Sequence, residues 1–233
     1  MTVQVLYKNS GSIKHTANLV LFVEKNFNIT GLKKHISNIE LSYISDLLKN
    51  CDLKKNILSF DLSSKKKIIL INIKDQTKSS GVENLGAELY DFIKVNKIGS
   101  LVVNSNSFNA KPGKDFLGRF LHGLKLKSYE FNKYRSKQET RHVNISIFGD
   151  KNKPSTQNQL KFKALEEGTF YARDLVSEPG NILHPDEYAK RLSSLKKYGL
   201  RINVYDSKKL KKLGMNALLG VGQGSVRGSY LVT

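Results

Sequence analysis

Short apolar runs alternate with amphipathic segments along the first 150 residues of the chain. Apolar runs with polar flanks predict strands at 3–7, 18–23, 66–73, 98–105 and 142–149. Apolar positions three and four residues apart predict helices at 39–50, 81–96 and 112–129, with Pro112 near the start of the last. Strands separated by helices are typical of a mainly parallel sheet with helices on both faces. Residues 1–150 are therefore predicted to form an α/β domain.

The pattern changes after residue 150. Residues 151–159 are polar, contain a proline and lack apolar periodicity, so they are predicted to be a linker. A helix follows and ends at Glu178, because a residue before proline is pushed out of helical geometry. Pro185 then suits the first turn of a new helix. Residues 160–233 are therefore predicted to begin a second domain.

The end of the chain continues this second pattern. A strand is predicted at 200–206 and another starts at 229–233. A short helix at 207–214 lies between them, with Ser207 as its N-cap and Gly214 as its stop. The second domain is therefore also expected to be of the α/β class.

Composition limits the protein classes that fit. Cys51 is the single cysteine among 233 residues, so no disulfide can form within the chain. No run approaches the roughly 18 apolar residues of a membrane span, and the first ten residues do not resemble a signal peptide. We therefore expect a cytoplasmic protein that does not bind a membrane. The net charge of +19 favours nucleic acid as a partner, although a general drift towards lysine explains the charge better.

Histidine and cysteine offer little chemistry in this sequence. The five histidines are His15, His35, His122, His142 and His184. Since none has metal-site spacing, they are predicted to be exposed or to cap helices. Cys51 stands alone before a lysine-rich turn and is interpreted as a bystander.

Two further stretches suggest ligand binding but favour structural roles. Gly220, Gly222 and Gly224 lack the dinucleotide-binding spacing and are predicted to form a tight turn between a helix and a strand. The basic segment 111–141 contains aromatic residues, as in single-strand binders. However, the helical spacing of Phe116 and Phe120 places them in a core, so the lysines are interpreted as a solvated face. Nucleic-acid binding by this segment stays the weaker alternative.

The carboxylates after the linker do not form a recognisable metal-ligand set. A two-metal centre needs several oxygen ligands close together. The acids here are predicted to lie on helix surfaces, at helix ends or at a strand end: Glu166, Glu167, Asp174, Glu178, Asp186, Glu187 and Asp206. No catalytic, metal-binding or substrate-binding residue is therefore assigned.

Three stretches nevertheless resemble one family. "YARDLVSEPGNILHPDEYAKRL" (171–192) and "LKKLGMNALLGVGQGSVRGSYLVT" (210–233) resemble the segments "ARDLxNEPxN" and "LGMxxLLxVGQGS" of the leucyl (cytosol) aminopeptidases, in order and at matching separation. "GLKLKSYEFNKYRSK" (123–137) is similar to "GxxLGSYxFDKYK" of that family, with Lys127 in place of a small residue. The chain is identified on these residues as a member of this family of metallopeptidases.

The resemblance implies a fold and an activity. It implies an N-terminal macro-like α/β domain with a mixed sheet flanked by helices, followed by an incomplete α/β peptidase domain. It further implies a homohexamer that removes leucine-type N-terminal residues from peptides with two divalent ions, manganese or zinc. The segments "GKGxxFDTGG" and "NTDAEGR", which carry the ligands and catalytic residues of the family, do not occur here. We therefore expect a fragment or a truncated gene product that binds no metal and is inactive alone.

The matched residues are expected to be structural. Arg173, Asp174, Glu178, Pro179 and Asn181 would lock the junction between the domains through caps and ion pairs. Two other functions stay open as alternatives. One is a nucleic-acid-binding protein derived from the same fold. The other is nucleotide binding by the macro-like half, which the scarcity of early glycines argues against.

Overall fold

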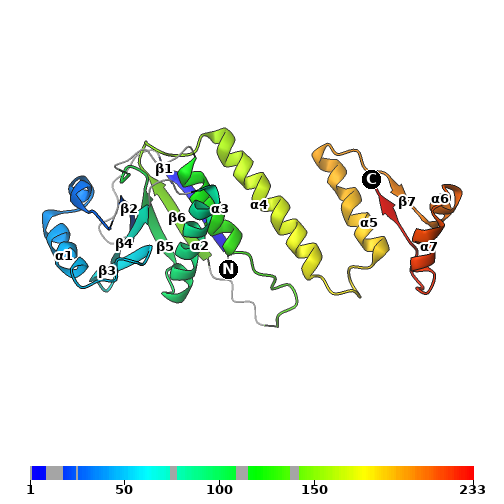
Figure 1. Ribbon diagram of the computed structural model, residues 1–233, viewed down its shortest axis with the longest axis horizontal. Helices are drawn as coiled ribbons and strands as arrows, with labels where there is room; N and C mark the ends of the chain where they lie inside the picture. The colour runs from blue at the N-terminus through cyan, green and yellow to red at the C-terminus, as the bar shows by residue number, and fades with distance from the viewer. Residues whose placement is uncertain (1, 9–17, 25, 74–77, 109–114, 137–141) are drawn as a thin grey trace. The chain divides into compact units, whose positions relative to one another are not determined.

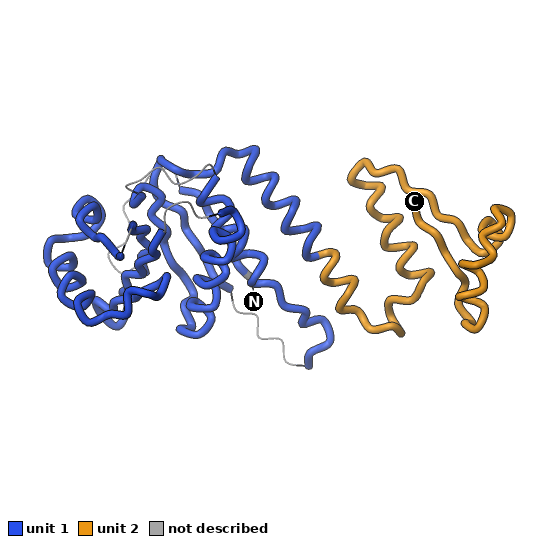
Figure 2. Tube along the Cα trace, in the orientation of Figure 1, with its two compact units in different colours: residues 1–170 blue, residues 171–233 orange. Residues whose placement is uncertain are grey.

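The structure is a computed structural model that describes residues 2–8, 18–24, 26–73, 78–108, 115–136 and 142–233. These residues form two compact units, 1–170 and 171–233, which Figure 2 colours separately. The helix α4 (Thr156–Ser177) carries the boundary between them. Residues 156–159 are thus helical, so the polar stretch before α4 is shorter than the predicted linker. The division into domains at 150 and 160 stays a prediction.

Unit 1 is built on a sheet of six described strands in the order β1-β6-β5-β2-β4-β3 (Figure 1). Only the pair β3 and β4 is antiparallel; the other neighbours are parallel. The predicted mainly parallel α/β sheet is therefore confirmed. The strands are β1 (Thr2–Lys8), β2 (Leu19–Glu24), β3 (Ile57–Ser63), β4 (Lys66–Ile73), β5 (Ser100–Asn104) and β6 (His142–Phe148).

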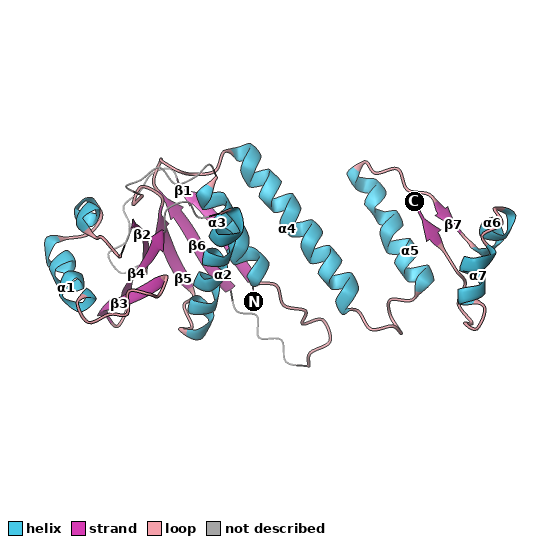
Figure 3. Cartoon of the chain, viewed as in Figure 1, coloured by secondary structure: helices cyan, strands magenta, loops and turns pink. Residues whose placement is uncertain are grey.

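Different helices cover the two faces of this sheet (Figure 3). α2 (Ser79–Val95) and α3 (Phe116–Lys127) pack with Phe22 of β2 in one apolar cluster. The 3-10 helix η1 (Thr30–Lys34) and α1 (Asn38–Leu48) pack with Leu21 in a second cluster. Because successive residues of a strand point to opposite faces, β2 contributes to both clusters and is almost completely buried.

Helices α2 and α3 cross closely because each has a glycine at the crossing. A Cβ atom on Gly86 would lie 1.9 Å from the backbone oxygen of Phe120. A Cβ atom on Gly123 would lie 1.9 Å from the backbone oxygen of Glu83. Since both obstacles are backbone atoms, no side-chain movement relieves the overlap. Only glycine therefore allows this helix pair to pack at its observed distance.

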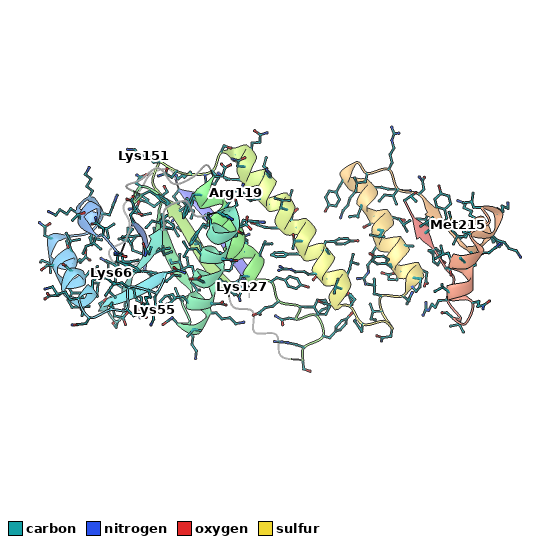
Figure 4. The ribbon with its side chains drawn as sticks, viewed as in Figure 1. Lys55, Lys66, Arg119, Lys127, Lys151 and Met215 are labelled. Atoms are coloured by element: carbon teal, nitrogen blue, oxygen red, sulfur yellow. The ribbon has the colours of Figure 1, made fainter. Side chains whose placement is uncertain are left out.

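Ion pairs accompany the same crossing. Nη1 of Arg119 lies 3.6 Å from Oε1 of Glu83, and Nζ of Lys127 lies 3.1 Å from Oδ2 of Asp91. Figure 4 labels both cations on α3. All four side chains are substantially exposed, so each pair contributes about 0–1 kcal/mol. The buried apolar side chains and the two glycines, not these charges, determine the packing of α2 on α3.

Unit 2 is smaller and contains short elements. After the last residues of α4 come α5 (Pro185–Ser193), the 3-10 helix η2 (Ser194–Tyr198), α6 (Ser207–Lys212) and α7 (Asn216–Gly222). β7 (Val204–Tyr205) and β8 (Leu231–Val232) form an antiparallel pair. Within 171–233, all of which the structure describes, Ala189 and Leu210 are the only apolar side chains that are buried. Unit 2 therefore has very little core of its own.

Several predicted elements need correction. The strand β3 was not predicted, and the strand predicted at 200–206 is only β7. The N-cap of α6 is Asp206, whose side chain accepts from the backbone N–H of Lys209 at 2.9 Å, and not Ser207. The helix predicted from Pro112 begins at Phe116 among the described residues, and Pro112 lies outside them.

Among the described residues, no helix combines the length and the apolar composition that crossing a bilayer requires.

Candidate functional site

A buried ionisable pair joins α3 to α4 in unit 1. Nδ1 of His122 lies 3.2 Å from Oε1 of Glu166, and the two side chains are 10% and 11% exposed. Nζ of Lys125 lies 3.8 Å from Oε2 of the same carboxylate. Phe162 packs on the imidazole, with ring centroids 5.2 Å apart. A buried carboxylate is costly unless cations or donors face it, and His122 and Lys125 supply them.

A cavity of about 370 Å³ opens beside this pair. Its apolar wall includes Val5 of β1, Leu121 of α3 and Phe170 of α4. Tyr7 also lines it; burial, and then the negative charge of Glu166, raise the pKa of Tyr7 to about 12. A phenol is protonated at neutral pH even at its ordinary pKa, so Tyr7 offers a hydroxyl donor to the cavity. A cavity of this size with apolar walls and a few converging polar groups is typical of a small-molecule site.

In unit 2, Arg191 closes the junction that the sequence marks between 171 and 192. Its Nη1 lies 3.0 Å from Oε1 of Glu178, whose side chain is 2% exposed. Its Nε donates to Oε1 of Glu187 at 3.0 Å, and this hydrogen bond lowers the pKa of the Glu187 carboxyl. Tyr171 Oη donates to the backbone oxygen of Arg191 at 2.9 Å. These contacts tie the end of α4 to α5, which agrees with the structural role expected of Glu178.

A second contact connects the start of α5 to the end of the chain. Asp186 lies within hydrogen-bond distance of Nδ1 of His184, and its Oδ2 lies 3.3 Å from Nη1 of Arg227. Desolvation opposes ionisation of Asp186. The hydrogen bonds from its own backbone N–H and from His184, with the charge of Arg227, nevertheless hold the pKa of its carboxyl below the usual value. Asp186 therefore anchors the glycine-rich segment through Arg227.

The glycine-rich segment itself differs from the prediction. Gly220 and Gly222 belong to α7, so the tight turn predicted to begin there is wrong for these two residues. A Cβ atom on Gly222 would lie 2.1 Å from Oγ of Ser229, so the end of α7 and the residues just before β8 approach closely at this position. A Cβ atom on Gly220 or Gly224 would meet nothing within 4 Å, so close packing requires glycine only at Gly222.

Among the described histidines, His142 and His184 follow the prediction. His142 is exposed, and His184 is the N-cap residue of α5. His35 is partly buried beside Nδ2 of Asn104, at 3.1 Å from its Nδ1, and burial lowers the pKa of His35. His15 lies outside the described residues. His122 is neither exposed nor capping, because it is buried between α3 and α4, where it contacts Glu166. The spacing of the histidines along the sequence cannot reveal this contact, since Glu166 belongs to another helix.

Cys51 has the bystander character that the sequence suggests. It follows the end of α1 and is partly buried. Its Sγ donates to the backbone oxygen of Leu47 at 3.3 Å. The thiol thus extends the hydrogen bonding of the last helical turn.

The carboxylates do not make a metal centre within the described part of the chain. No three His, Cys, Asp or Glu side chains gather there as a ligand group. Glu178, Asp186 and Glu187 each face a cation of the protein. Glu166 contradicts the prediction that the acids lie on helix surfaces, since it is buried in the wall of the cavity. The described residues thus do not fit a two-metal site.

In 115–136, the described part of the basic segment, Phe116 and Phe120 lie in the core as the sequence predicts. Phe116 and Phe120 are buried in the core, so they cannot stack on bases. The ring of Tyr129 packs on Phe170, with centroids 5.4 Å apart. Residues 111–114 and 137–141 lie outside the described residues.

Comparison with known proteins places this chain in a family. Residues 170–233 match the profile of the catalytic domain of the cytosol aminopeptidase family. A probable cytosol aminopeptidase of Bradyrhizobium sp. is 40% identical over 114 residues, which are 47% of this chain and 23% of that protein. One of Caulobacter vibrioides is 32% identical over 174 residues, 71% of this chain and 34% of that protein. The chain belongs to the cytosol aminopeptidase family.

Solved structures agree with the fold of this aminopeptidase family. A mutant of tomato leucine aminopeptidase has a TM-score of 0.75 over 99% of this chain and 50% of that chain, at 17% identity. The bottromycin maturation enzyme BotP has a TM-score of 0.69 over 93% and 45%, also at 17% identity. At such identities the likeness establishes the fold alone. This chain spans between 23% and 34% of the two curated relatives.

Proposed function

We propose that this chain supplies the N-terminal α/β domain, residues 1–150, and the start of the catalytic domain, residues 160–233, of an aminopeptidase. The whole enzyme removes N-terminal residues of the leucine type from peptides. One observation carries the proposal, namely the match of residues 170–233 to the catalytic domain of the family. The leucine aminopeptidase fold over nearly the whole chain supports it.

Metal dependence is part of the proposal for the whole enzyme only. The family resemblance brings two divalent ions, manganese or zinc, and one related solved structure is of BotP in complex with Mn. The residues described here do not fit such a centre, because their carboxylates face cations of the protein instead. We propose that the 233-residue polypeptide alone binds neither ion and does not hydrolyse peptides.

The residues of unit 2 have a supporting role in this proposal. Arg191 holds Glu178 and Glu187, so the turn between α4 and α5 has a defined geometry. Asp186 and Arg227 hold the segment after α7 against the start of α5. Such contacts position the backbone on which a catalytic domain is built, without touching a substrate themselves.

The remaining properties of the enzyme follow from the resemblance. We propose a homohexamer in the cytoplasm that acts on peptides. The alternative of a nucleic-acid-binding protein has no support from the relatives named above, which are aminopeptidases. The burial of Phe116 and Phe120 takes two aromatic rings of the basic segment away from any stacking surface, whereas Tyr134 is 53% exposed.

Hydrolysis of leucine p-nitroanilide tests the proposal. The purified 233-residue polypeptide, supplied with Mn²⁺ or Zn²⁺, is expected to show no turnover. A chimera in which this chain replaces the matching part of the Caulobacter relative is expected to hydrolyse the substrate. The same relative without that part serves as the inactive control. A folded chimera that binds Mn²⁺ but remains inactive would argue against the proposed function.

A further inference from the structure

The cavity in unit 1 lies apart from every residue that matches the catalytic domain, except Phe170 at the edge of the match. It is open to solvent on one side and is lined by residues of β1, α3 and the first part of α4. These residues all belong to unit 1. A volume of about 370 Å³ accommodates a molecule of roughly ten non-hydrogen atoms together with water.

Opposite charges converge on this cavity. The carboxylate of Glu166 is buried in its wall, and Lys125 lines it with Nζ 3.8 Å from that carboxylate. A carboxylate has about four acceptor positions. The hydrogen bond with His122 uses one of them. Glu166 can therefore accept further hydrogen bonds from a ligand that carries a cationic donor.

The other walls set the shape of the ligand. Val5, Leu121, Phe162 and Phe170 give an apolar surface beside the charged groups. Tyr7, which is protonated at neutral pH, adds a neutral hydroxyl donor and no further negative charge. The site thus presents an acceptor for an ammonium group, a cation for a carboxylate and an apolar wall for a side chain.

We propose that this cavity binds a free α-amino acid with an apolar side chain, of which L-leucine is a representative. The ammonium group of the ligand is bound by Glu166 and its carboxylate by Lys125. The side chain lies against the apolar wall. Glu166 would repel a ligand that carries only a negative charge, and Lys125 would repel a ligand that carries only a positive charge. An amino acid, which is a zwitterion, therefore fits better than either.

This site is separate from the proposed peptidase activity. Free amino acids are products of an aminopeptidase, so the cavity is suited to sense product if the proposed function holds. The binding itself rests only on the residues of unit 1. Failure of the proposed function would leave amino-acid binding in place, and failure of binding would leave the proposed function in place.

Nuclear magnetic resonance titration of the ¹⁵N-labelled 233-residue protein tests the inference. L-leucine is expected to give saturable shifts in residues of α3 and α4, with a Kd below about 1 mM for a ligand of this size. L-leucinamide, which lacks the carboxylate, and 4-methylpentanoate, which lacks the amine, are each expected to bind about tenfold more weakly. Absence of saturation up to about 10 mM L-leucine, or equal affinity for 4-methylpentanoate, would overturn the inference.

Substitutions locate the binding. Glu166→Gln is expected to weaken binding about tenfold or more, because a charged hydrogen bond is lost. Leu160→Trp places a large ring at the cavity at a position that is 63% exposed, so the fold should tolerate it while binding is lost. Leu165→Trp is the matched control on the same helix, 48% exposed and not part of the cavity lining.

The two tryptophan variants keep the test decisive even if Glu166→Gln disturbs the fold. The inference requires that Leu160→Trp abolishes the saturable shifts and that Leu165→Trp leaves the Kd within about twofold. Equal binding by both variants would place the ligand elsewhere. Loss of binding in both would show a general effect on α4 and would also contradict the proposed site.

Discussion

The two units of this chain bury apolar residues to very different extents. In unit 1, whole strands such as β2 and β4 are buried, and helices cover both faces of the sheet. In unit 2, Ala189 and Leu210 are the only buried apolar side chains, while Val221 is 88% exposed. Unit 2 is instead organised by hydrogen bonds and ion pairs around Arg191 and Asp186. The comparison indicates that unit 1 can fold on its own core, whereas unit 2 presents apolar surface that needs a partner.

The largest expected effect comes from separating the two regions. Residues 1–170 alone are expected to be monodisperse and to unfold cooperatively in urea, because their core is complete. Residues 160–233 alone are expected to be poorly soluble and to bind a hydrophobic dye such as ANS, because their apolar surface is exposed. Circular dichroism melts and light scattering measure both. If the fragment 160–233 were monodisperse and melted cooperatively, the two units would not differ in their ability to fold alone.

A second prediction concerns the close crossing of α2 and α3. Gly86→Ala and Gly123→Ala are each expected to lower the free energy of unfolding by about 3 kcal/mol, since the added Cβ meets a backbone oxygen. Gly168→Ala in α4 is the control, because its Cβ meets nothing within 4 Å. There alanine is expected to raise the helical stability by about 0.5–1 kcal/mol. Urea unfolding of the whole chain measures all three variants.

If Gly86→Ala and Gly123→Ala unfolded at the same urea concentration as the unchanged chain, the helices could separate without cost. The core of unit 1 would then be less tightly specified than its burial suggests.

The third prediction addresses the polar organisation of unit 2. Glu178→Gln removes the buried charge that faces Arg191, so amide hydrogen exchange in α5 is expected to accelerate about ten- to a hundredfold. Glu187→Gln is the control, because the Glu187 side chain is 28% exposed and loses less when its charge is removed. If hydrogen exchange accelerated equally in the two variants, the burial of Glu178 would not add to the stability of α5.

The smallest effect concerns an ion pair on the surface of unit 1. Nζ of Lys94 donates to Oε1 of Glu130 at 2.7 Å, and this hydrogen bond is the largest of the interactions, one from Asn132 among them, that lower the pKa of Glu130 to about 2. A carboxyl whose pKa is lower in the folded state stabilises the fold above its unfolded pKa, near 4.5. That contribution is lost as the pH falls from about 4.5 to about 2.

Because the Lys94 side chain is 55% exposed and the Glu130 side chain 27%, solvent screens the pair, and the expected contribution is only about 0.5 kcal/mol. The unfolding free energy of Lys94→Met should therefore fall by about 0.5 kcal/mol less between pH 5 and pH 2 than that of the unchanged chain. Lys55→Met, at an exposed position in the same unit, should leave it unchanged. Urea unfolding at several pH values measures the difference, and identical pH profiles for the two variants would contradict the role of Lys94.

Much of the fold of unit 1 could be predicted from local patterns. β4 was predicted as Lys66–Ile73, because a continuous apolar run with polar flanks is typical of a buried strand. β3 was missed although Leu58 and Phe60 alternate with polar residues, a pattern that indicates a half-buried edge strand. Its antiparallel pairing with β4 is a property of the sheet and not of either segment.

The polar residues were harder to assign. Glu178 was predicted to be structural from its place at a helix end, and its ion pair with Arg191 agrees with that role. Ser207 was predicted as an N-cap, but the preceding Asp206 takes that position. Both residues are good N-caps, so propensity alone could not choose between them.

By itself, the sequence determined the alternation of strands and helices, the end of α4 before Pro179 and the membership of the aminopeptidase family. These features depend on residues that are close along the chain. Only the tertiary structure decided that Gly86 and Gly123 meet a neighbouring helix, and that His122 meets Glu166 beside a cavity. The physical reason is that burial and pairing depend on which surfaces meet, and residues 44 positions apart carry no local sign of their contact.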